Sequence, residues 1–251
     1  MSIVTLLTDF GTIDSYVAEV KGVLLSQAPL ATLIDITHEI PPGNVRAAAY
    51  LLERAWKHFP PSTVHLVVVD PGVGTERAAL VLTLQHQFFV GPDNGVFTSI
   101  LSQPGVLATV LPIPEDAAPT FHGRDVFAPA AASLANRGWW PELGKRLTGP
   151  GVRLERHSPQ PAGSGWIGEI VYVDRFGNLV TNLGRQHLAP QCVIKVGAAE
   201  IPLVKTYEEV APGALLAYLG SGGALEIAVR GGSASQVLQA KLGQTVRVEQ
   251  G

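Results

Sequence analysis

The sequence contains a single cysteine, Cys192, among its 251 residues. One thiol cannot form a disulfide within the chain or supply the thiolate cluster of a structural zinc site. No apolar stretch approaches the roughly 20 residues that span a bilayer, so we expect no membrane association. The first residues, Met1 to Val4, lack the charged region that opens a signal peptide. These absences predict a soluble, cytoplasmic protein.

Charge of one sign is not concentrated anywhere in the sequence. Lys and Arg number 18 against 21 for Asp and Glu, which gives a net charge of −3 without any basic run. Nucleic-acid binding relies on clustered cations that neutralise phosphates, so we expect no nucleic-acid partner. With 46% hydrophobic and 16% charged residues, the composition excludes intrinsic disorder.

Several motifs of common enzymes are also missing. Neither G-x-G-x-x-G nor G-x-x-x-x-G-K-[ST] occurs, so nucleotide phosphates lack their usual cradle. The absence of G-x-S-x-G argues against an acyl hydrolase. The seven histidines lack the H-x-x-x-H spacing that would place two on one helix face. We therefore predict no metal site, and expect most of the histidines to be surface or hydrogen-bonded core residues.

The first half of the chain alternates apolar strands with amphipathic helices. Asp14 is the expected N-cap of a first helix, because Val17, Val20 and Leu24 follow it at helical spacing. A second, longer helix is expected over 45–59, with strands at 3–10, 31–37 and 63–70. This alternation predicts an α/β domain over residues 1–150, with a mostly parallel sheet and flanking helices.

The pattern changes after about Leu147. Residues 148–165 are rich in proline and glycine without an apolar period, as is typical of a linker. Only short strand-like runs follow, at 166–173, 179–183, 192–196, 214–219, 224–229 and 245–248. These runs predict a smaller C-terminal all-β domain, barrel-like, over residues 165–251.

Two aspartates stand at the ends of predicted strands. Asp9 and Asp70 each precede a glycine-containing turn, and ligands of open parallel sheets bind beyond the carboxyl ends of the strands. An aspartate at such a place often only caps the next turn. Two such aspartates, at the ends of different predicted strands, favour a ligand-binding site.

His122 precedes a predicted helix through residues 130–135. The positive end of the helix dipole disfavours an imidazolium, so a neutral His122 is expected that accepts a proton or orients a water molecule. The structural alternative is a turn in which Arg124 and Asp125 form a local ion pair.

In the second half, Asp174, Phe176 and Asn178 surround Gly177. They could recognise a flat base by stacking and amide hydrogen bonds, or simply form a hairpin turn. The role of the glycine cluster 220–223, which Leu225 and Glu226 follow, is equally ambiguous from the sequence.

Taken together, these segments stand in the order of one family's motifs: residues 7–11, 70–77, 91–95, 121–125, 174–178 and 221–233. Over residues 9 to 233 the chain resembles the S-adenosyl-L-methionine hydroxide adenosyltransferases, the adenosine-forming hydrolases of S-adenosyl-L-methionine. Fluorinases and chlorinases are their relatives. The resemblance implies an N-terminal α/β domain and a C-terminal barrel-like domain. It also implies a homotrimer that binds its small-molecule substrate at subunit interfaces.

The resemblance further implies roles for individual residues. The family's catalytic set falls on Asp70, Arg77 and His122, with water attacking the ribose 5′ carbon. Its ribose-diol carboxylate falls on Asp9. For adenine, the matching positions are Phe176 and Asn178, with the backbone of Val229 and Gly231 nearby. For the methionine part, they are Asp14, Asp174 and Ser221. Glu226 is a further substrate-binding position. No metal or cofactor is implied, since S-adenosyl-L-methionine is the substrate.

Differences from the halogenases favour water as the nucleophile. In those relatives a serine matching Gly123 helps to bind halide, and the catalytic aspartate and histidine are absent. The fluorinase-type insertion is also missing, because only residues 78–90 separate Arg77 from Gly91. Fluorinases carry a serine that matches Tyr16 and an arginine that matches Gly222, so the methionine contacts stay open.

Three alternatives to this hydrolase remain. One is a sensor that binds S-adenosyl-L-methionine or adenosine without turnover, and another is a halogenase that uses the same substrate. The third is a nucleoside hydrolase, which would release adenine.

Overall fold

The computed structural model describes residues 2–137, 144–189 and 191–250. The chain divides into two compact units, residues 1–154 and 155–251. The division lies inside the segment 148–165 that the composition predicts as a linker. That segment is not wholly irregular, because its strand β8 (Gln160–Ala162) pairs with a strand of the second unit.

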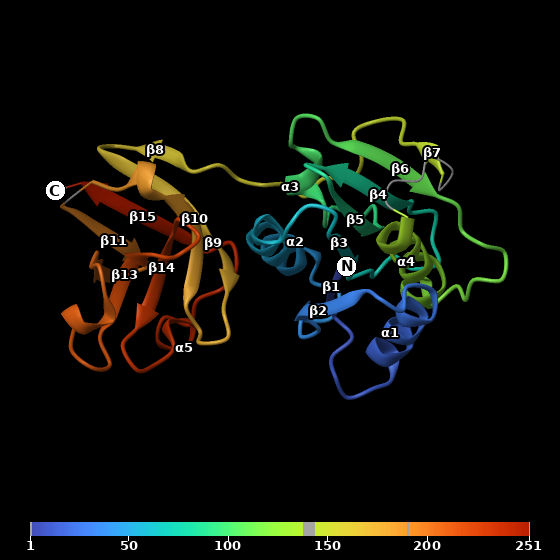
Figure 1. The fold of residues 1–251 in the computed structure, drawn as a ribbon. Helices are drawn as coiled ribbons and strands as arrows, with labels where there is room; N and C mark the ends of the chain where they lie inside the picture. The colour runs from blue at the N-terminus through green and yellow to red at the C-terminus, as the bar shows by residue number, and fades with distance from the viewer. Residues whose placement is uncertain (1, 138–143, 190, 251) are drawn as a thin grey trace. The chain divides into compact units, whose positions relative to one another are not determined.

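The first unit is built on a seven-stranded sheet of order β2-β1-β3-β5-β4-β6-β7 (Figure 1). Its strands are β1 (Ile3–Thr8), β2 (Thr32–Thr37), β3 (Val64–Val68), β4 (Ala79–Leu84), β5 (Gln87–Pro92), β6 (Leu107–Leu111) and β7 (Lys145–Arg146). The pairs from β2 to β5 are parallel, whereas β5-β4, β4-β6 and β6-β7 are antiparallel. The α/β class is confirmed, and the sheet is parallel in one half only. The antiparallel half begins where a tight turn at residues 85–86, both with positive φ, joins β4 to β5.

Helices cover both faces of this sheet. They are α1 (Tyr16–Gln27), α2 (Val45–Ala55), α3 (Thr98–Leu101) and α4 (Ala128–Arg137). The prediction that Asp14 caps α1 is wrong, because the N-cap is Ser15 and Asp14 lies exposed in the preceding loop. Helix α2 ends at Ala55 and continues as a 3-10 turn, Trp56–His58. Its Asn44 cap accepts the backbone N–H of Ala47 at 3.0 Å.

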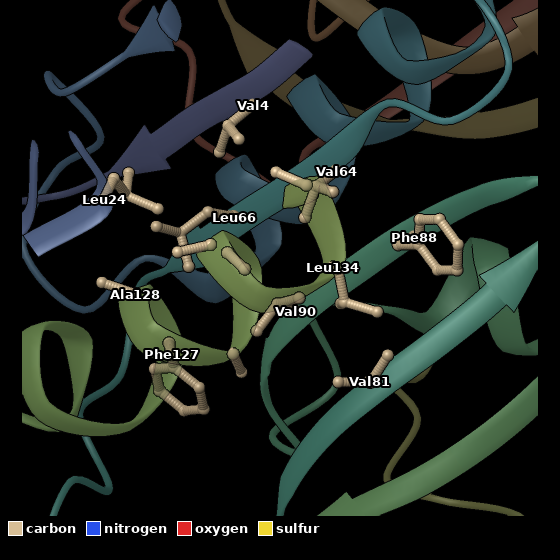
Figure 2. Packing of buried hydrophobic residues seen from close by; sticks show 14 of the residues in the cluster. Val4, Leu24, Val64, Leu66, Val81, Phe88, Val90, Phe127, Ala128 and Leu134 are labelled. Atoms are coloured by element: carbon tan, nitrogen blue, oxygen red, sulfur yellow. The ribbon is translucent and has the colours of Figure 1, made fainter. Parts of the chain in front are cut away.

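Alternation along the strands decides which side chains each helix layer covers. Val4, Val64, Leu66 and Val90 pack with Leu24 of α1 and with residues of α4 in one apolar cluster (Figure 2). Figure 2 shows Leu134 of α4 among the strand side chains of this cluster. Side chains of this size contribute about 1.5–3 kcal/mol each when fully buried. His65, one residue along β3, therefore faces the opposite layer, where its ring stacks on Phe89 at 4.9 Å.

The second unit is an antiparallel sheet of order β12-β11-β15-β9-β10-β14-β13, with β8 on β9. Its strands are β9 (Gly165–Val173), β10 (Leu179–Gly184), β11 (Cys192–Val196), β12 (Ala199–Pro202), β13 (Leu215–Leu219), β14 (Ala224–Val229) and β15 (Thr245–Gln250), and a short helix α5 (Ala234–Val237) follows β14. The two edges meet through the bridge between Leu203 and Ala217, where Val204 N donates to Ala217 O at 2.8 Å. The barrel-like fold is confirmed. All six predicted strands are present, and β8 and β12 are additional.

Among the described residues, no helix combines the length and the apolar character needed to cross a bilayer.

Candidate active site

A pocket lies at the carboxyl ends of β1 and β3. These two strands are parallel neighbours, with Thr8 opposite Val68, so the residues after each strand stand side by side. The pocket has a volume of about 160 Å³. Its lining is Asp9, Phe10, Gly43, Val68, Asp70, Pro71, Val73, Thr120, Phe121, His122 and Gly123. The structure thus brings Asp9, Asp70 and His122, all singled out from the sequence, into one pocket.

Arg77 joins Asp70 to His122. Its Nε donates to both carboxylate oxygens of Asp70, at 3.1 and 2.9 Å, and its Nη2 donates to Oδ2 as well. The same Nη2 lies 2.9 Å from His122 Nδ1. The side chains of Asp70 and Arg77 are only 5% and 8% exposed. Three polar groups from two distant segments therefore form one buried array.

The contact with Arg77 determines which His122 nitrogen carries the proton. A guanidinium group is only a donor, so Nδ1 must accept and the neutral ring carries its hydrogen on Nε2. Burial, aided by the Arg77 charge, lowers the pKa of His122 below its ordinary value. This direction is the one expected for a neutral ring, and burial is its largest cause.

The segment that carries His122 is fixed by its neighbours. His122 is the N-cap of a π-helical turn, Gly123–Phe127, that leads into α4. Arg124 pairs with Asp125 and with Glu19 of α1, and Asp125 accepts the Ala118 N–H at 2.9 Å. The ion pair of Arg124 and Asp125, expected as an alternative to function, therefore exists beside the array.

The backbone at Gly123 passes close to the pocket wall. A Cβ added there would lie 3.2 Å from the Phe10 ring and 3.2 Å from a Val68 methyl group. Few Cβ atoms approach neighbours so closely. Val68 ends β3, and Phe10 lies just beyond β1 and lines the pocket.

Asp9 is held by a residue that sequence reasoning missed. Its Oδ2 accepts the backbone N–H of Gly43 at 2.8 Å, and Gly43 has φ of +71°. The Pro41-Pro42-Gly43 turn directly before the Asn44 cap is the signal that could have located it. Asp14 is not among the described residues that line the pocket. It lies in the exposed loop before α1.

In the second unit, Asp174 shapes the hairpin between β9 and β10. Its Oδ1 accepts the backbone N–H groups of Phe176 and Asn178 at 2.9 and 2.8 Å, and Oδ2 accepts Asn178 Nδ2 at 2.9 Å. Both carboxylate oxygens thus serve the turn. The Phe176 side chain is left 74% exposed, which is costly for an aromatic ring and suits a stacking surface.

Three of the other candidates of this unit, Ser221, Val229 and Gly231, lie at the two ends of β14. The turn at Gly177 packs on Ser233 and accepts the Ser235 N–H at 2.9 Å, so Val229 and Gly231 lie at the same end as Phe176 and Asn178. Ser221 lies at the opposite end, in the turn between β13 and β14. Glu226 is buried within β14 and accepts the Tyr218 hydroxyl at 2.7 Å.

Metal ligands do not gather in the described ranges 2–137, 144–189 and 191–250. No group of three or more His, Cys, Asp or Glu side chains there has the arrangement of an ion site.

Comparison with protein families identifies both halves of the chain. Residues 4–144 match the SAM hydroxide adenosyltransferase N-terminal domain, and residues 168–247 match the C-terminal domain of the same family. The chain belongs to this family. The motif resemblance described above is therefore confirmed across both units.

The family's named members include close relatives of this chain. An (R)-S-adenosyl-L-methionine hydrolase of Thermus thermophilus is 45% identical, with 96% of this chain and 97% of that protein covered. A hydrolase of the same name from Salinispora tropica is 36% identical, with 99% of this chain and 98% of that protein covered. A fluorinase of Nocardia brasiliensis is more distant, at 28% identity, with 99% of this chain and 97% of that protein covered. The crystal structure of a conserved, uncharacterized protein of Thermotoga maritima matches with a TM-score of 0.90 and 39% identity, over 98% of this chain and 99% of that chain.

Proposed function

We propose that this protein hydrolyses S-adenosyl-L-methionine to adenosine and L-methionine. The array of Asp70, Arg77 and His122 beside Asp9 is the observation that carries this proposal. The names of the similar hydrolases support the (R) epimer at sulfur as the substrate.

In the proposed step a water oxygen bonds to the ribose 5′ carbon while the bond from that carbon to sulfur breaks. The bonding electron pair goes to sulfur, so methionine leaves as a neutral thioether. Asp70 accepts the water's proton, since a carboxylate has about four lone-pair sites and Arg77 leaves some of them open. The proton then passes to solvent.

His122 orients the water in this mechanism instead of removing its proton. With hydrogen on Nε2, the ring donates to the water oxygen and leaves another lone pair for the 5′ carbon. Positioning of this kind contributes about 7–11 kcal/mol in favourable cases. Phe10, Val68 and Phe121 line the pocket with apolar surface, which limits competing solvent around the sulfonium. The reaction is redox-neutral and consumes only water, so we propose that it needs no metal or cofactor.

We take the substrate contacts from the family resemblance described above. Asp9 would bind the ribose diol, and Phe176 with Asn178 the adenine, near the Val229 and Gly231 backbone. Asp174 would act mainly by shaping the turn that presents them, since its oxygens are engaged. Ser221, at the far end of β14, fits the methionine end of an elongated substrate; Asp14 and Glu226 are further proposed contacts.

Product analysis tests the proposed reaction. Incubation with S-adenosyl-L-methionine in ¹⁸O-labelled water should give methionine and adenosine, with the label in the adenosine 5′-hydroxyl. Adenine as the main product would indicate a nucleoside hydrolase, and a 5′-halogenated adenosine formed with added halide would indicate a halogenase. Binding of S-adenosyl-L-methionine without formation of any product would indicate a sensor.

We further propose a homotrimer in which one subunit's Asp9–Asp70 pocket and another subunit's Phe176 turn share each substrate. The pocket volume of about 160 Å³ is below the roughly 300–1,000 Å³ of most ligand sites, which supports a site completed by other residues. We also propose a cytoplasmic location, because the substrate is an intracellular metabolite.

Mixed trimers test the shared site. Co-expressed Asp70→Ala and Asn178→Ala subunits should recover about a quarter of wild-type activity, since random assembly pairs two intact halves in that fraction of sites. Each variant alone, and the two purified separately and then mixed without exchange, serve as controls. A fully active monomer in light scattering, or no recovery in verified mixed trimers, would refute the shared site.

A further inference from the structure

A buried threonine and a buried histidine are hydrogen bonded directly behind the pocket. Thr8 ends β1 and His38 follows the end of β2, and the two strands are parallel neighbours. Thr8 Oγ1 lies 2.8 Å from His38 Nδ1, and the residues are only 1% and 5% exposed. Neither side chain lines the pocket as described, so neither is placed to touch a substrate.

Further polar contacts extend from both members of this pair. The Phe10 N–H donates to Thr8 Oγ1 at 3.3 Å, and the same oxygen shares a hydrogen with His38 Nδ1. His38 Nε2 lies 3.1 Å from Asp35 Oδ1 in a less well aligned contact. Asp35 in turn binds Lys21 Nζ at 2.6 Å. His38 therefore lies between a surface ion pair and the hydroxyl that accepts the Phe10 N–H.

The same two residues also hold the backbone on either side of Asp9. The Gly11 N–H donates to His38 O at 2.8 Å, and the Ile40 N–H donates to Thr8 O at 3.4 Å. Gly11 has φ of +66°, so the chain turns sharply just after Asp9. The turn at residues 9–11 is thus fixed on both sides by Thr8 and His38.

We propose that Thr8 and His38 are positioning residues that hold Asp9 in place to bind the ribose diol. The proposal rests on the function proposed above, in which Asp9 binds that diol. Two parallel strands deliver Asp9 to the pocket edge, and the Thr8–His38 bond joins the two segments whose backbone hydrogen bonds hold the turn beyond that edge. Asp9 reaches the Gly43 N–H in this orientation, so its carboxylate is already oriented before a substrate arrives.

The protein contains a matched control for this proposal. Thr5 lies on the same strand, is 0% exposed, and its Oγ1 is 2.8 Å from Nδ1 of buried His65. The chemistry is the same as that of Thr8 and His38, but Thr5 lies in the middle of β1, away from the pocket. Thr5→Val and Thr8→Val therefore remove the same kind of bond at two distances from Asp9.

Steady-state kinetics separates positioning from stability. Thr8→Val should raise the KM for S-adenosyl-L-methionine and the Kd for adenosine about tenfold, as loss of a supported hydrogen bond would, with kcat changed less than about twofold. His38→Leu should do the same, and Thr8→Ser, which keeps the hydroxyl, should restore most of the affinity. Thr5→Val should lower the urea midpoint but leave KM and Kd unchanged. Equal KM values for Thr8→Val and Thr5→Val would overturn the proposal.

Two further measurements link the effect to Asp9. In an Asp9→Ala background, Thr8→Val should raise KM no further, because the contact that it positions is already lost. An additive effect would refute the proposal. Amide hydrogen exchange at Phe10 and Gly11 should be faster in Thr8→Val than in wild type or Thr5→Val, and unchanged exchange would also refute it. This last measurement does not depend on turnover, so a wild-type protein without hydrolysis or adenosine binding would refute only the proposed function.

Discussion

Replacing Asp70 with asparagine should lower kcat by about 10²–10⁴-fold while changing KM little. The amide cannot accept the water's proton as a carboxylate does, and its NH₂ group would face the donors of Arg77. The proposed substrate contacts are Asp9 and the Phe176 turn, which this substitution leaves intact. The loss of rate therefore appears in the chemical step, after the substrate is bound. Single-turnover kinetics with pre-bound S-adenosyl-L-methionine would measure the chemical step directly.

The Asp70→Asn experiment needs two controls. Glu76→Gln makes the same change from carboxylate to amide at an exposed position of the same loop, and it should leave kcat unchanged. Urea unfolding should accompany both variants, because breaking a buried ion pair costs about 3–5 kcal/mol of stability by itself. A folded Asp70→Asn protein with near wild-type kcat would remove Asp70 from the mechanism and favour the sensor.

The second large effect concerns acid stability. His65 should contribute a loss of about 3 kcal/mol in the free energy of unfolding as the pH falls from 6.5 to 4. Burial against Phe59 and Phe89 lowers its pKa to about 4, although the hydrogen bond with Gln87 acts in the opposite direction. The unfolded chain binds a proton on this ring near pH 6.5, whereas the folded protein does not until about pH 4. The stability is therefore present above pH 6.5 and is lost below it.

Urea denaturation at several pH values, for wild type and His65→Gln, isolates this contribution. The variant should be less stable at pH 7 because the Thr5 and Gln87 hydrogen bonds are disturbed, but its stability should fall less steeply between pH 6.5 and 4. His122 and His187, whose pKa values burial also lowers, contribute equally to both proteins. Identical pH slopes would show that His65 does not titrate differently in the two states.

Periodicity predicted the elements whose signal is local. The continuous apolar runs of β1 and β3 and the stripe of α2 required no knowledge of neighbours. Periodicity does not predict strands β4 to β7, because their pairing depends on contacts between distant segments. It predicts Asp14 as the N-cap of α1, but Ser15 occupies that place without a side-chain cap hydrogen bond. The first residue of a helix is uncertain by one or two positions, and the sequence alone does not distinguish Asp14 from Ser15 as the cap.

The candidate site was predictable only where strand ends carry polar residues. Asp9 and Asp70 could be located because carboxyl ends of neighbouring parallel strands meet at one edge. The bond from Arg77 to His122 joins residues 45 positions apart, so the resemblance to a family indicated it and spacing did not. The sequence does not distinguish His38 from an ordinary core histidine, since nothing near it in the chain reveals the contact with Thr8.

The tight fit at Gly123 bears on how this scaffold could change its nucleophile. A serine there would place a hydroxyl at the pocket wall, as the family resemblance implies for the halogenases, yet its Cβ would meet Phe10 and Val68 at 3.2 Å. Both the ring and the methyl group would have to retreat by a few tenths of an ångström to restore an ordinary contact. Conversion to halide use is therefore an epistatic problem: the effect of a substitution at residue 123 depends on whether residues 10 and 68 can move by that amount or have already been replaced.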